Sequence, residues 1–374
     1  MTPQSIQSLS PQAVRLARTA VAILAAGLCV LVVFGSVPQA NALAGGPTPT
    51  LPGRIYCSAS WNLSNDGVKI GVLSFDPNTG RQRAEPVSSN YEVVSFDRNT
   101  GSQRTDLVSS HALLLRIAPL TKTAAYEVSL LRWQQVVIAR LDGAAKEVRI
   151  LRTPGVAGIA WAPDGVRLVV TTWVHKQVGR ERGLPRTETW LVKSDGSARA
   201  RLPIPDTHVV LDWSRDGRFF LTSLPLRTQP RAKISGFPMV LYTMGIDGTC
   251  VTRMTADEEN AHYGRISPDS KTIAYITSGG ERFPNLRYGV SIVRTNGDGR
   301  REIMHHNAAV PVDMCWCPDG KHLAVQIREW QKNAFGHISS AGSHLEIFDL
   351  FGNRLRTIAP KDVKFFEDAS LDWQ

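Results

Sequence analysis

Cysteine is scarce in this chain, with five in 374 residues. One of them, Cys29, lies in an N-terminal segment that we expect to be removed, which leaves four in the mature chain. So few cysteines exclude a fold held together mainly by disulfides. Cys315 and Cys317 flank one tryptophan, and on a strand such a pair supplies at most two ligands to a metal. We therefore expect buried free thiols rather than a metal or redox motif.

The usual catalytic motifs are also lacking. There is no Gly-x-Ser-x-Gly nucleophile elbow, no glycine-rich phosphate loop, no His-Glu-x-x-His pair and no Cys-x-x-Cys pair. These absences argue against a peptidase and give no reason to expect a cofactor. The net charge of +10 is a mild excess for this length and does not form the concentrated stripe typical of nucleic-acid binding, so nucleic acid is not an expected ligand. The hydrophobic share of 43% excludes a disordered or collagen-like chain.

Long apolar runs are limited to one, Thr19–Phe34, and its 16 residues are few for a membrane span. Two arginines precede the run, and small residues follow it at a spacing typical of signal-peptide cleavage. We expect residues 1–44 to be a signal peptide, with an uncleaved anchor as the alternative. Residues 45–374 would then form a periplasmic or secreted domain that meets the membrane only if this segment is retained.

One turn recurs through the chain at spacings of 52, 53 and 50 residues: Trp161-Ala-Pro-Asp-Gly165, Trp213-Ser-Arg-Asp-Gly217, Ile266-Ser-Pro-Asp-Ser270 and Trp316-Cys-Pro-Asp-Gly320. Pro presets the first turn angle, Asp caps the turn and Gly takes the left-handed position. A second turn, most often Asp-Gly, follows in each repeat, so each unit contains two hairpins. Because the Asp recurs at one place, its expected role is structural rather than catalytic.

The number of repeats predicts the number of blades in the ring. A fifth, less regular copy of the repeat has its turn at residues 117–121, and the chain ends at 369–374 with only the first strand of a repeat. That strand needs a partner, which the opening strands beginning at Arg54 can supply. We predict an all-β, six-bladed β-propeller of four-stranded antiparallel blades, closed by pairing of the N- and C-terminal strands. Residues 72–89 and 93–110 are a close duplication, of which one copy would be an added hairpin.

The repeated Trp-Ser/Ala-Pro-Asp-Gly turns resemble the WD-like repeats of TolB-type propellers, over roughly residues 54–374. The resemblance implies an exported six-bladed propeller that serves protein–protein interaction at the cell envelope. One departure is that the separate α/β domain that precedes the propeller in TolB has no counterpart between the signal segment and the first strand. Similar repeats occur in the propellers of prolyl-oligopeptidase-like peptidases and of some pectin-fragment lyases.

Long connections between the second and third strands of four repeats are rich in basic residues, with 11 Lys or Arg against four Glu. Long loops on a rigid ring are common binding surfaces, and Arg beside aromatic residues favours protein interfaces. We therefore expect a non-catalytic scaffold that binds a protein partner, or another anionic partner, through this rim. The candidate binding residues are Arg180, Arg182, Arg186, Arg231, Lys233, Arg282, Arg287, Trp330 and Lys332.

Three histidines, His208, His262 and His306, precede inner strands and are weak candidates for metal ligands. They support an alternative function, a metal-dependent lyase or hydrolase that acts on an acidic oligosaccharide at the central channel.

Charges also alternate at the position before each repeat's first residue, where neighbouring inner strands approach the channel. This pattern predicts two ion pairs, Asp372 with Arg116 and Asp212 with Arg265.

Overall fold

The computed structural model describes most of the unit Pro49–Gln374. The described residues are 49–63, 67–84, 92–96, 103–107, 112–121, 123–129, 134–140, 148–174, 186–225, 239–279, 287–306, 309–332, 338–359, 363–365 and 371–374. The predicted signal segment, residues 1–44, lies outside them. Within the described ranges, no helix has the length and apolar character needed to cross a bilayer.

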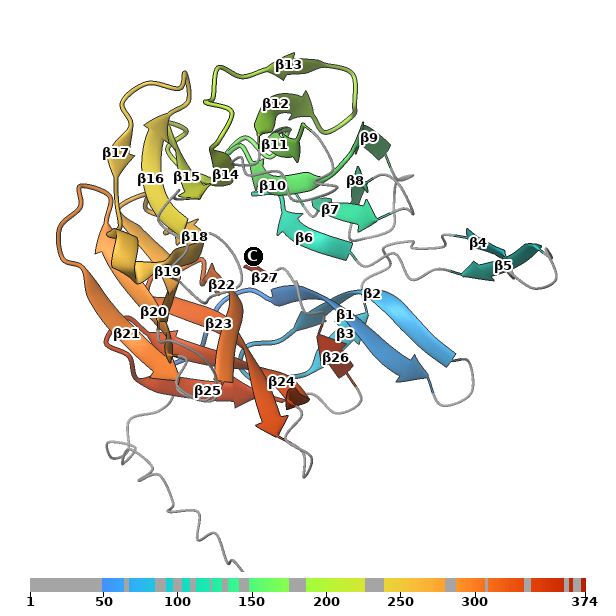
Figure 1. The fold of residues 1–374 in the computed structure, drawn as a ribbon. Helices are drawn as coiled ribbons and strands as arrows, with labels where there is room; N and C mark the ends of the chain where they lie inside the picture. Colours follow the sequence, from blue (N-terminus) through green and yellow to red (C-terminus); the bar gives the residue numbers. More distant parts are fainter. Residues whose placement is uncertain are drawn as a thin grey trace, which may run out of the picture. The chain divides into compact units, whose positions relative to one another are not determined.

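Five sheets each contain four antiparallel strands that are consecutive in the chain (Figure 1). Each sheet is named below by its first, innermost strand. The strands of the β6 and β10 blades are β6 Ala112–Ile117, β7 Thr123–Ser129, β8 Gln134–Arg140, β9 Val148–Thr153, β10 Val156–Trp161, β11 Arg167–Trp173, β12 Thr187–Lys193 and β13 Arg199–Arg201. Those of the β14, β18 and β22 blades are β14 Val209–Trp213, β15 Phe219–Pro225, β16 Met239–Gly245, β17 Thr252–Arg253, β18 Ala261–Ile266, β19 Thr272–Gly279, β20 Arg287–Arg294, β21 Arg301–His306, β22 Ala309–Trp316, β23 His322–Lys332, β24 Ile338–Asp349 and β25 Arg354–Ile358.

A further sheet joins the two ends of the propeller. It contains β1 Ile55–Leu63, β2 Gly67–Phe75 and β3 Gln82–Ala84, with β26 Val363–Phe365 and β27 Leu371–Trp373 along the free edge of β1. Ile55 pairs with Trp373, and the backbones of Arg54 and Gln374 exchange hydrogen bonds of 2.7 and 3.1 Å. The predicted closure by the terminal strands is therefore confirmed.

The inner strands contact one another in the order β6, β10, β14, β18, β22 and β27, and β27 contacts β6 in turn. The predicted all-β propeller of four-stranded antiparallel blades is thus confirmed. The one helix among the described residues is the 3-10 helix η2 Asp257–Glu259. Strands β4 Glu92–Phe96 and β5 Gln103–Leu107, from the second copy of the duplication, form a two-stranded sheet of their own.

The recurring turn owes its shape to its own residues. In the β10 blade, the carboxylate of Asp164 accepts the backbone N–H groups of Val166 and Arg167 at 2.9 and 3.0 Å, and Gly165 takes a φ of +67°. Asp216, Asp269 and Asp319 accept backbone N–H groups in the same way. The expected structural role of this aspartate is confirmed.

The topology defines two rims. We call "turn rim" the side that carries the turns from first to second strand and from third to fourth strand, such as 162–166 and 194–197. The opposite side, the "long-loop rim", carries the connections from second to third strand. The repeat's first residue ends the inner strand just below the turn rim and is buried, as in Trp161 and Trp316. The indole N–H of Trp161 donates to the carbonyl of Arg116, and that of Trp316 to the carbonyl of Arg265, each at 3.0 Å. These bonds tie the β10 blade to the β6 blade and the β22 blade to the β18 blade.

Cys315 and Cys317 are buried free thiols, as expected, and Cys250 is an exposed free thiol.

Candidate functional site

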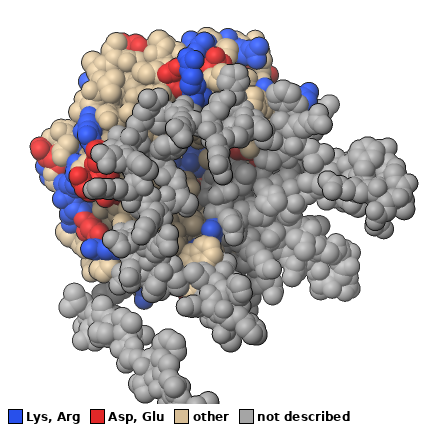
Figure 2. Space-filling view, in the orientation of Figure 1, with Lys and Arg blue, Asp and Glu red and all other residues tan. Residues whose placement is uncertain are grey.

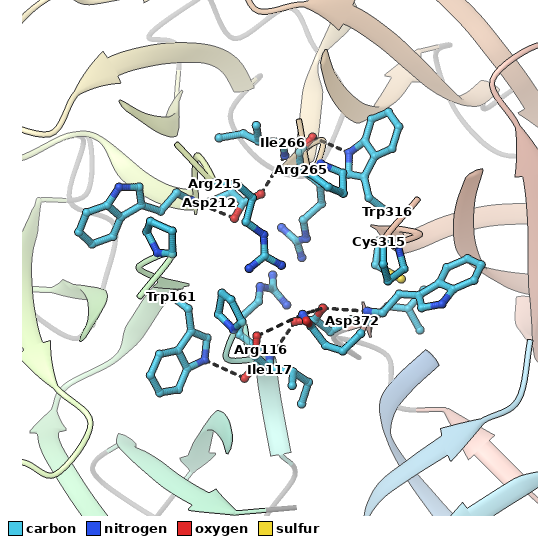
Figure 3. A pocket seen from close by; sticks show the side chains of 18 of the residues that line it. Arg116, Ile117, Trp161, Asp212, Arg215, Arg265, Ile266, Cys315, Trp316 and Asp372 are labelled. Atoms are coloured by element: carbon cyan, nitrogen blue, oxygen red, sulfur yellow. Dashed lines mark hydrogen bonds between the residues drawn. The ribbon is translucent and has the colours of Figure 1, made fainter. Parts of the chain in front are cut away.

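Charged side chains converge on the channel where the inner strands reach the turn rim (Figure 3). They line a pocket of about 380 Å³ together with indoles and the prolines of the turns. The charged and thiol side chains of its lining are Arg116, Asp212, Arg215, Arg265, Cys315 and Asp372. Bulges interrupt the pairing of first and second strands in all five four-stranded blades, just before the charged positions in most of them. Such bulges re-aim side chains, which explains why strand alternation alone does not place these groups.

Three aspartates link neighbouring blades through backbone N–H groups. The carboxylate of Asp212 accepts the N–H of Ile266 at 2.8 Å, and that of Asp372 accepts the N–H of Ile117 at 2.7 Å. Asp313 does the same for Leu371 at 2.9 Å. In each case the acceptor belongs to one inner strand and the donor to the next one around the ring. The carboxylates therefore act as cross-links between blades, and the last two lie where the chain ends meet.

The predicted pairs Asp372–Arg116 and Asp212–Arg265 are wrong, because neither comes within the 4.0 Å that defines an ion pair. Both arginines turn instead to Asp313. Arg265 Nη2 lies 2.9 and 3.1 Å from its two oxygens, and Arg116 Nη1 lies 3.7 Å from one of them. The predicted partners are occupied by backbone N–H groups, which are fixed in position and need no side-chain ordering.

Sequence reasoning missed Asp313, which lies three residues before Trp316 rather than one. A bulge between Pro311 and Asp313 brings it to the channel, where its side chain is 2% exposed. The signal that could have identified it is a lone carboxylate in the apolar run before Trp316.

The electrostatics of the channel follow from this burial. Desolvation, and then the charge of Arg265, lower the pKa of Arg116 to about 10, so that it stays protonated at neutral pH. Burial alone would lower the pKa of Arg265, but the nearby carboxylates, Asp313 foremost, raise it. Burial raises the pKa of Asp212 against the attraction of Arg265. The Nε of Arg116 is buried and has no partner among the described residues.

Arg215 completes the pocket at the position where the other four turns have proline. It is exposed, and it forms no hydrogen bond or ion pair with any described residue. In Figure 3 its guanidinium points to the middle of the pocket, as do those of Arg116 and Arg265. Three guanidiniums face one opening, while the carboxylates of Asp212 and Asp372 bind backbone N–H groups. The site can therefore accept a carboxylate or another small anion.

Large apolar side chains are exposed around the same rim. Five of the six exposed large hydrophobic residues in the described part of the chain lie at its turns: Leu120, Val166, Ile246, Val251 and Phe351. Leu120 is 94% exposed and lines the pocket, and Phe351 is 82% exposed. Exposed apolar side chains gathered on one face are typical of interaction surfaces.

The predicted long-loop residues fall into two groups. Arg186, Arg287 and Trp330 lie near strand ends at the long-loop rim, where Arg186 pairs with Asp206 at 2.6 Å and Arg287 with Glu302 at 2.8 Å. Lys332 ends β23 at the same rim, and the guanidinium of Arg328 lies 5.7 Å from the ring centroid of Trp330. Arg180, Arg182, Arg231, Lys233 and Arg282 lie outside the described residues. Described basic side chains have acidic ones beside them on the face shown in Figure 2.

The three candidate histidines occupy different surroundings. His208 is buried against Thr222, with Nδ1 3.0 Å from its Oγ1, and burial lowers its pKa. Burial also lowers the pKa of His262, to about 4, and its Nε2 lies 3.4 Å from Ser278 Oγ. The Nε2 of His306 lies 3.4 Å from Oε2 of Glu346. In the described part of the chain one group of three His, Cys, Asp or Glu side chains is close enough to share a metal, and it contains none of these histidines.

Comparisons with known proteins agree with the fold. No protein-family model and no curated protein matches the chain. Among solved structures, TolB from Acinetobacter baumannii matches with a TM-score of 0.56 at 14% identity, over 87% of this chain and 67% of that one. A chain from the nidogen/laminin complex matches with a TM-score of 0.52 at 13% identity, over 86% and 98%. At such identities the likeness concerns the fold alone, and the chain is a β-propeller similar to that of TolB.

Proposed function

We propose that this chain is an exported, non-catalytic propeller that binds a protein partner through its turn rim and seats an acidic group of that partner in the channel mouth. The observation that carries the proposal is the pocket with Arg116, Arg215 and Arg265 directed into it. Of these three arginines, Arg215 is the one that is exposed and has no partner among the described residues. It can therefore bind a carboxylate without first breaking an internal hydrogen bond or ion pair.

The surroundings of the pocket favour a protein over a small anion. Leu120 and Phe351 expose apolar surface on the rim that holds the pocket. Protein interfaces combine such apolar and aromatic contacts with arginine, whereas a free anion would need only the charges. The long-loop rim, with the candidate residues from Arg180 to Lys332, remains a second face for the same function, with Trp330 beside Arg328 as its described aromatic contact.

A binding measurement with defined peptides tests the proposal. We expect acidic peptides to bind the full chain, and the same peptides with Asn and Gln in place of Asp and Glu to bind far more weakly. The affinity should fall with added salt, because the guanidinium of Arg215 is exposed to solvent. Arg215→Ser should weaken binding by about tenfold, which corresponds to about 1.4 kcal/mol.

The matched control is Arg218→Ser. Arg218 lies three residues further along the same turn, is also exposed, and does not line the channel pocket. It should change the affinity by less than about twofold. Equal losses in both variants, or turnover of an acidic oligosaccharide that a chelator abolishes, would contradict the proposal.

Export is a separate part of the proposal and rests on the N-terminal pattern. We expect the exported protein to begin after Ala42 or Ala44. Intact-mass measurement on protein recovered from outside the cytoplasm tests this. A full-length mass would instead support the uncleaved anchor.

A further inference from the structure

The turns between first and second strands share one backbone frame. In each, the residue after the repeat's first position donates its N–H to the carbonyl five residues later, at 2.7 to 3.0 Å. The five pairs are Ala118 with Thr123, Ala162 with Arg167, Ser214 with Phe219, Ser267 with Thr272 and Cys317 with His322. This bond holds the two positions side by side, next to the turn's aspartate where the turn has one.

Other turns show that side chains at these positions meet. In the β10 blade Arg167 Nε donates to Asp164 Oδ2 at 2.7 Å. In the β18 blade Ser267 Oγ donates to Asp269 Oδ1 at 2.5 Å, and the N–H of Thr272 donates to Ser267 Oγ at 2.9 Å. The backbone of the turn therefore brings these side chains together, and the residue types at the positions decide what they can bind.

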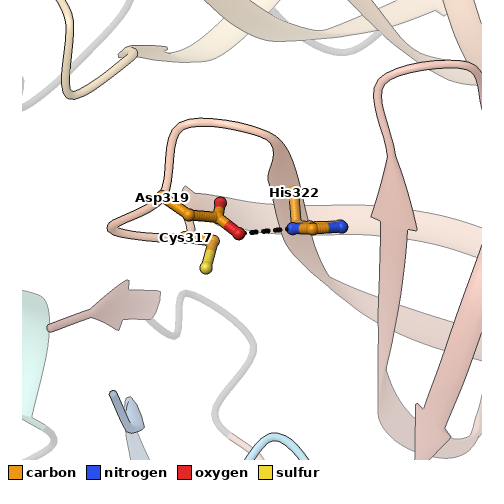
Figure 4. A group of neighbouring side chains, drawn as sticks. All are labelled: Cys317, Asp319 and His322. Atoms are coloured by element: carbon orange, nitrogen blue, oxygen red, sulfur yellow. Dashed lines mark hydrogen bonds and ion pairs between the residues drawn. The ribbon is translucent and has the colours of Figure 1, made fainter. Parts of the chain in front are cut away.

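The turn of the β22 blade places a thiol, a carboxylate and an imidazole at these positions (Figure 4). The ligand atoms of Cys317, Asp319 and His322 all lie within 4.8 Å of one another, and His322 Nδ1 lies 2.7 Å from Asp319 Oδ2. In a tetrahedral zinc site, bonds of 2.0 to 2.3 Å place two ligand atoms about 3.5 Å apart. Small side-chain rotations would therefore bring the three atoms around one ion.

We propose that Cys317, Asp319 and His322 form a binding site for Zn²⁺ or a similar divalent transition metal. Thiolate, imidazole and carboxylate together are the donor set that zinc prefers, whereas magnesium and calcium prefer oxygen alone. Three protein ligands leave one coordination position for water or for a side chain of a partner.

The surroundings suit such a site. The N–H of Lys321 donates to Asp319 Oδ1 at 2.8 Å, which orients the carboxylate and leaves Oδ2 toward the histidine. The side chains of Asp319 and His322 are 26% and 13% exposed, so an ion can enter from solvent. Zinc binds the thiolate and the neutral imidazole, so metal binding releases the thiol proton of Cys317 and affinity should rise with pH.

A Co²⁺ titration of the full chain, followed by displacement with Zn²⁺, tests the inference. The protein should carry Cys250→Ser, since Cys250 is an exposed free thiol that could bind metal independently. We expect one equivalent of Co²⁺ with the absorption of a tetrahedral ion and a thiolate charge-transfer band. Zn²⁺ should displace it and raise the thermal midpoint, because a ligand that binds only the folded state stabilises it.

Two test substitutions introduce residues that already occupy the equivalent positions in another turn of this chain. Cys317→Ser and His322→Thr reproduce the residues of the β18 blade, Ser267 and Thr272, so both should fold. Each should lower metal affinity by at least about 100-fold, since loss of an outer-sphere partner alone costs 10- to 100-fold. The control Asp269→Asn, at the equivalent aspartate of the β18 blade, should change neither affinity nor spectrum.

Absence of binding at millimolar metal, or a charge-transfer band that survives Cys317→Ser, would overturn the site. Neither result would bear on acidic-peptide binding at Arg215, so the two proposals fail separately.

Discussion

Two arginines of the channel, Arg116 and Arg265, and two of the long-loop rim, Arg186 and Arg287, pair with carboxylates in opposite settings. In the channel, Arg116 and Arg265 are 12% and 8% exposed and share the buried Asp313. At the long-loop rim, Arg186 and Arg287 are 71% and 59% exposed, and each has a single acidic partner. A buried charge must be paired to be tolerated and so sets the geometry around it, whereas an exposed pair is screened and contributes little. The difference shows that burial, more than residue type, decides which ion pairs shape this fold.

The largest effect should come from Asp313→Ala. Without this carboxylate two buried guanidiniums lose their shared partner and the N–H of Leu371 loses its acceptor. We expect the free energy of unfolding to fall by about 3 to 5 kcal/mol, the range for a buried pair broken on one side. Denaturant unfolding measures the change. A loss below about 1 kcal/mol would mean that water solvates these charges and that the channel resembles the rim.

Asp372→Asn should have the next largest effect, because it weakens the cross-link to Ile117 at the place where the chain ends meet. Hydrogen bonds to a charged group contribute about 1.5 to 3 kcal/mol, and the amide retains part of this. Asp212→Asn is the matched control, since its carboxylate makes the same bond to Ile266 away from the closure.

Hydrogen exchange distinguishes the two aspartates. Exchange of the β1 and β27 backbone should quicken in Asp372→Asn and not in Asp212→Asn. Equal exchange in both variants would show that the closure needs no special cross-link.

A half-buried histidine, His262, should make stability depend on pH. Burial lowers the pKa of His262 from 6.5 to about 4. As the pH falls below about 6.5, the unfolded chain therefore takes up a proton that the folded chain refuses until about pH 4. Stability should decline across this window by an amount on the order of 2 kcal/mol. Thermal unfolding of wild type and His262→Gln at a series of pH values should show a shallower decline in the variant, and parallel curves would contradict this origin.

The smallest effect on stability should come from the long-loop rim. Replacing Arg186 and Arg287 with Ser removes two exposed ion pairs and should change the free energy of unfolding by less than about 1 kcal/mol. If this rim binds the partner, the quadruple replacement of Arg180, Arg182, Arg231 and Arg287 with Ser should weaken binding at an unchanged thermal midpoint. Comparison with Arg215→Ser in one binding assay shows which face the partner uses.

Sequence reasoning reached the fold through local features. The Pro-Asp-Gly turns depend on residues that are close in the chain, so their repetition could be read without tertiary information. The closing strand could be placed because Leu371–Trp373 is a first strand without a blade of its own. The channel could be predicted only in part. The partners were not predicted correctly, but four residues were correctly placed at its wall: Arg116, Asp212, Arg265 and Asp372.

The pairing depended on distances that sequence spacing does not contain. The bulge before Asp313 moves this carboxylate to the channel, and the blade-to-blade approach offers backbone N–H groups to Asp212 and Asp372. The exposed apolar side chains of the turn rim likewise came to lie on one side of the molecule only when the blades assembled. The shape of a turn depends on interactions among a few consecutive residues, so the amino-acid sequence determines it directly. Which charges meet depends on how separate sheets pack, because a shift of an ångström or two decides whether a carboxylate reaches a guanidinium or a backbone N–H first.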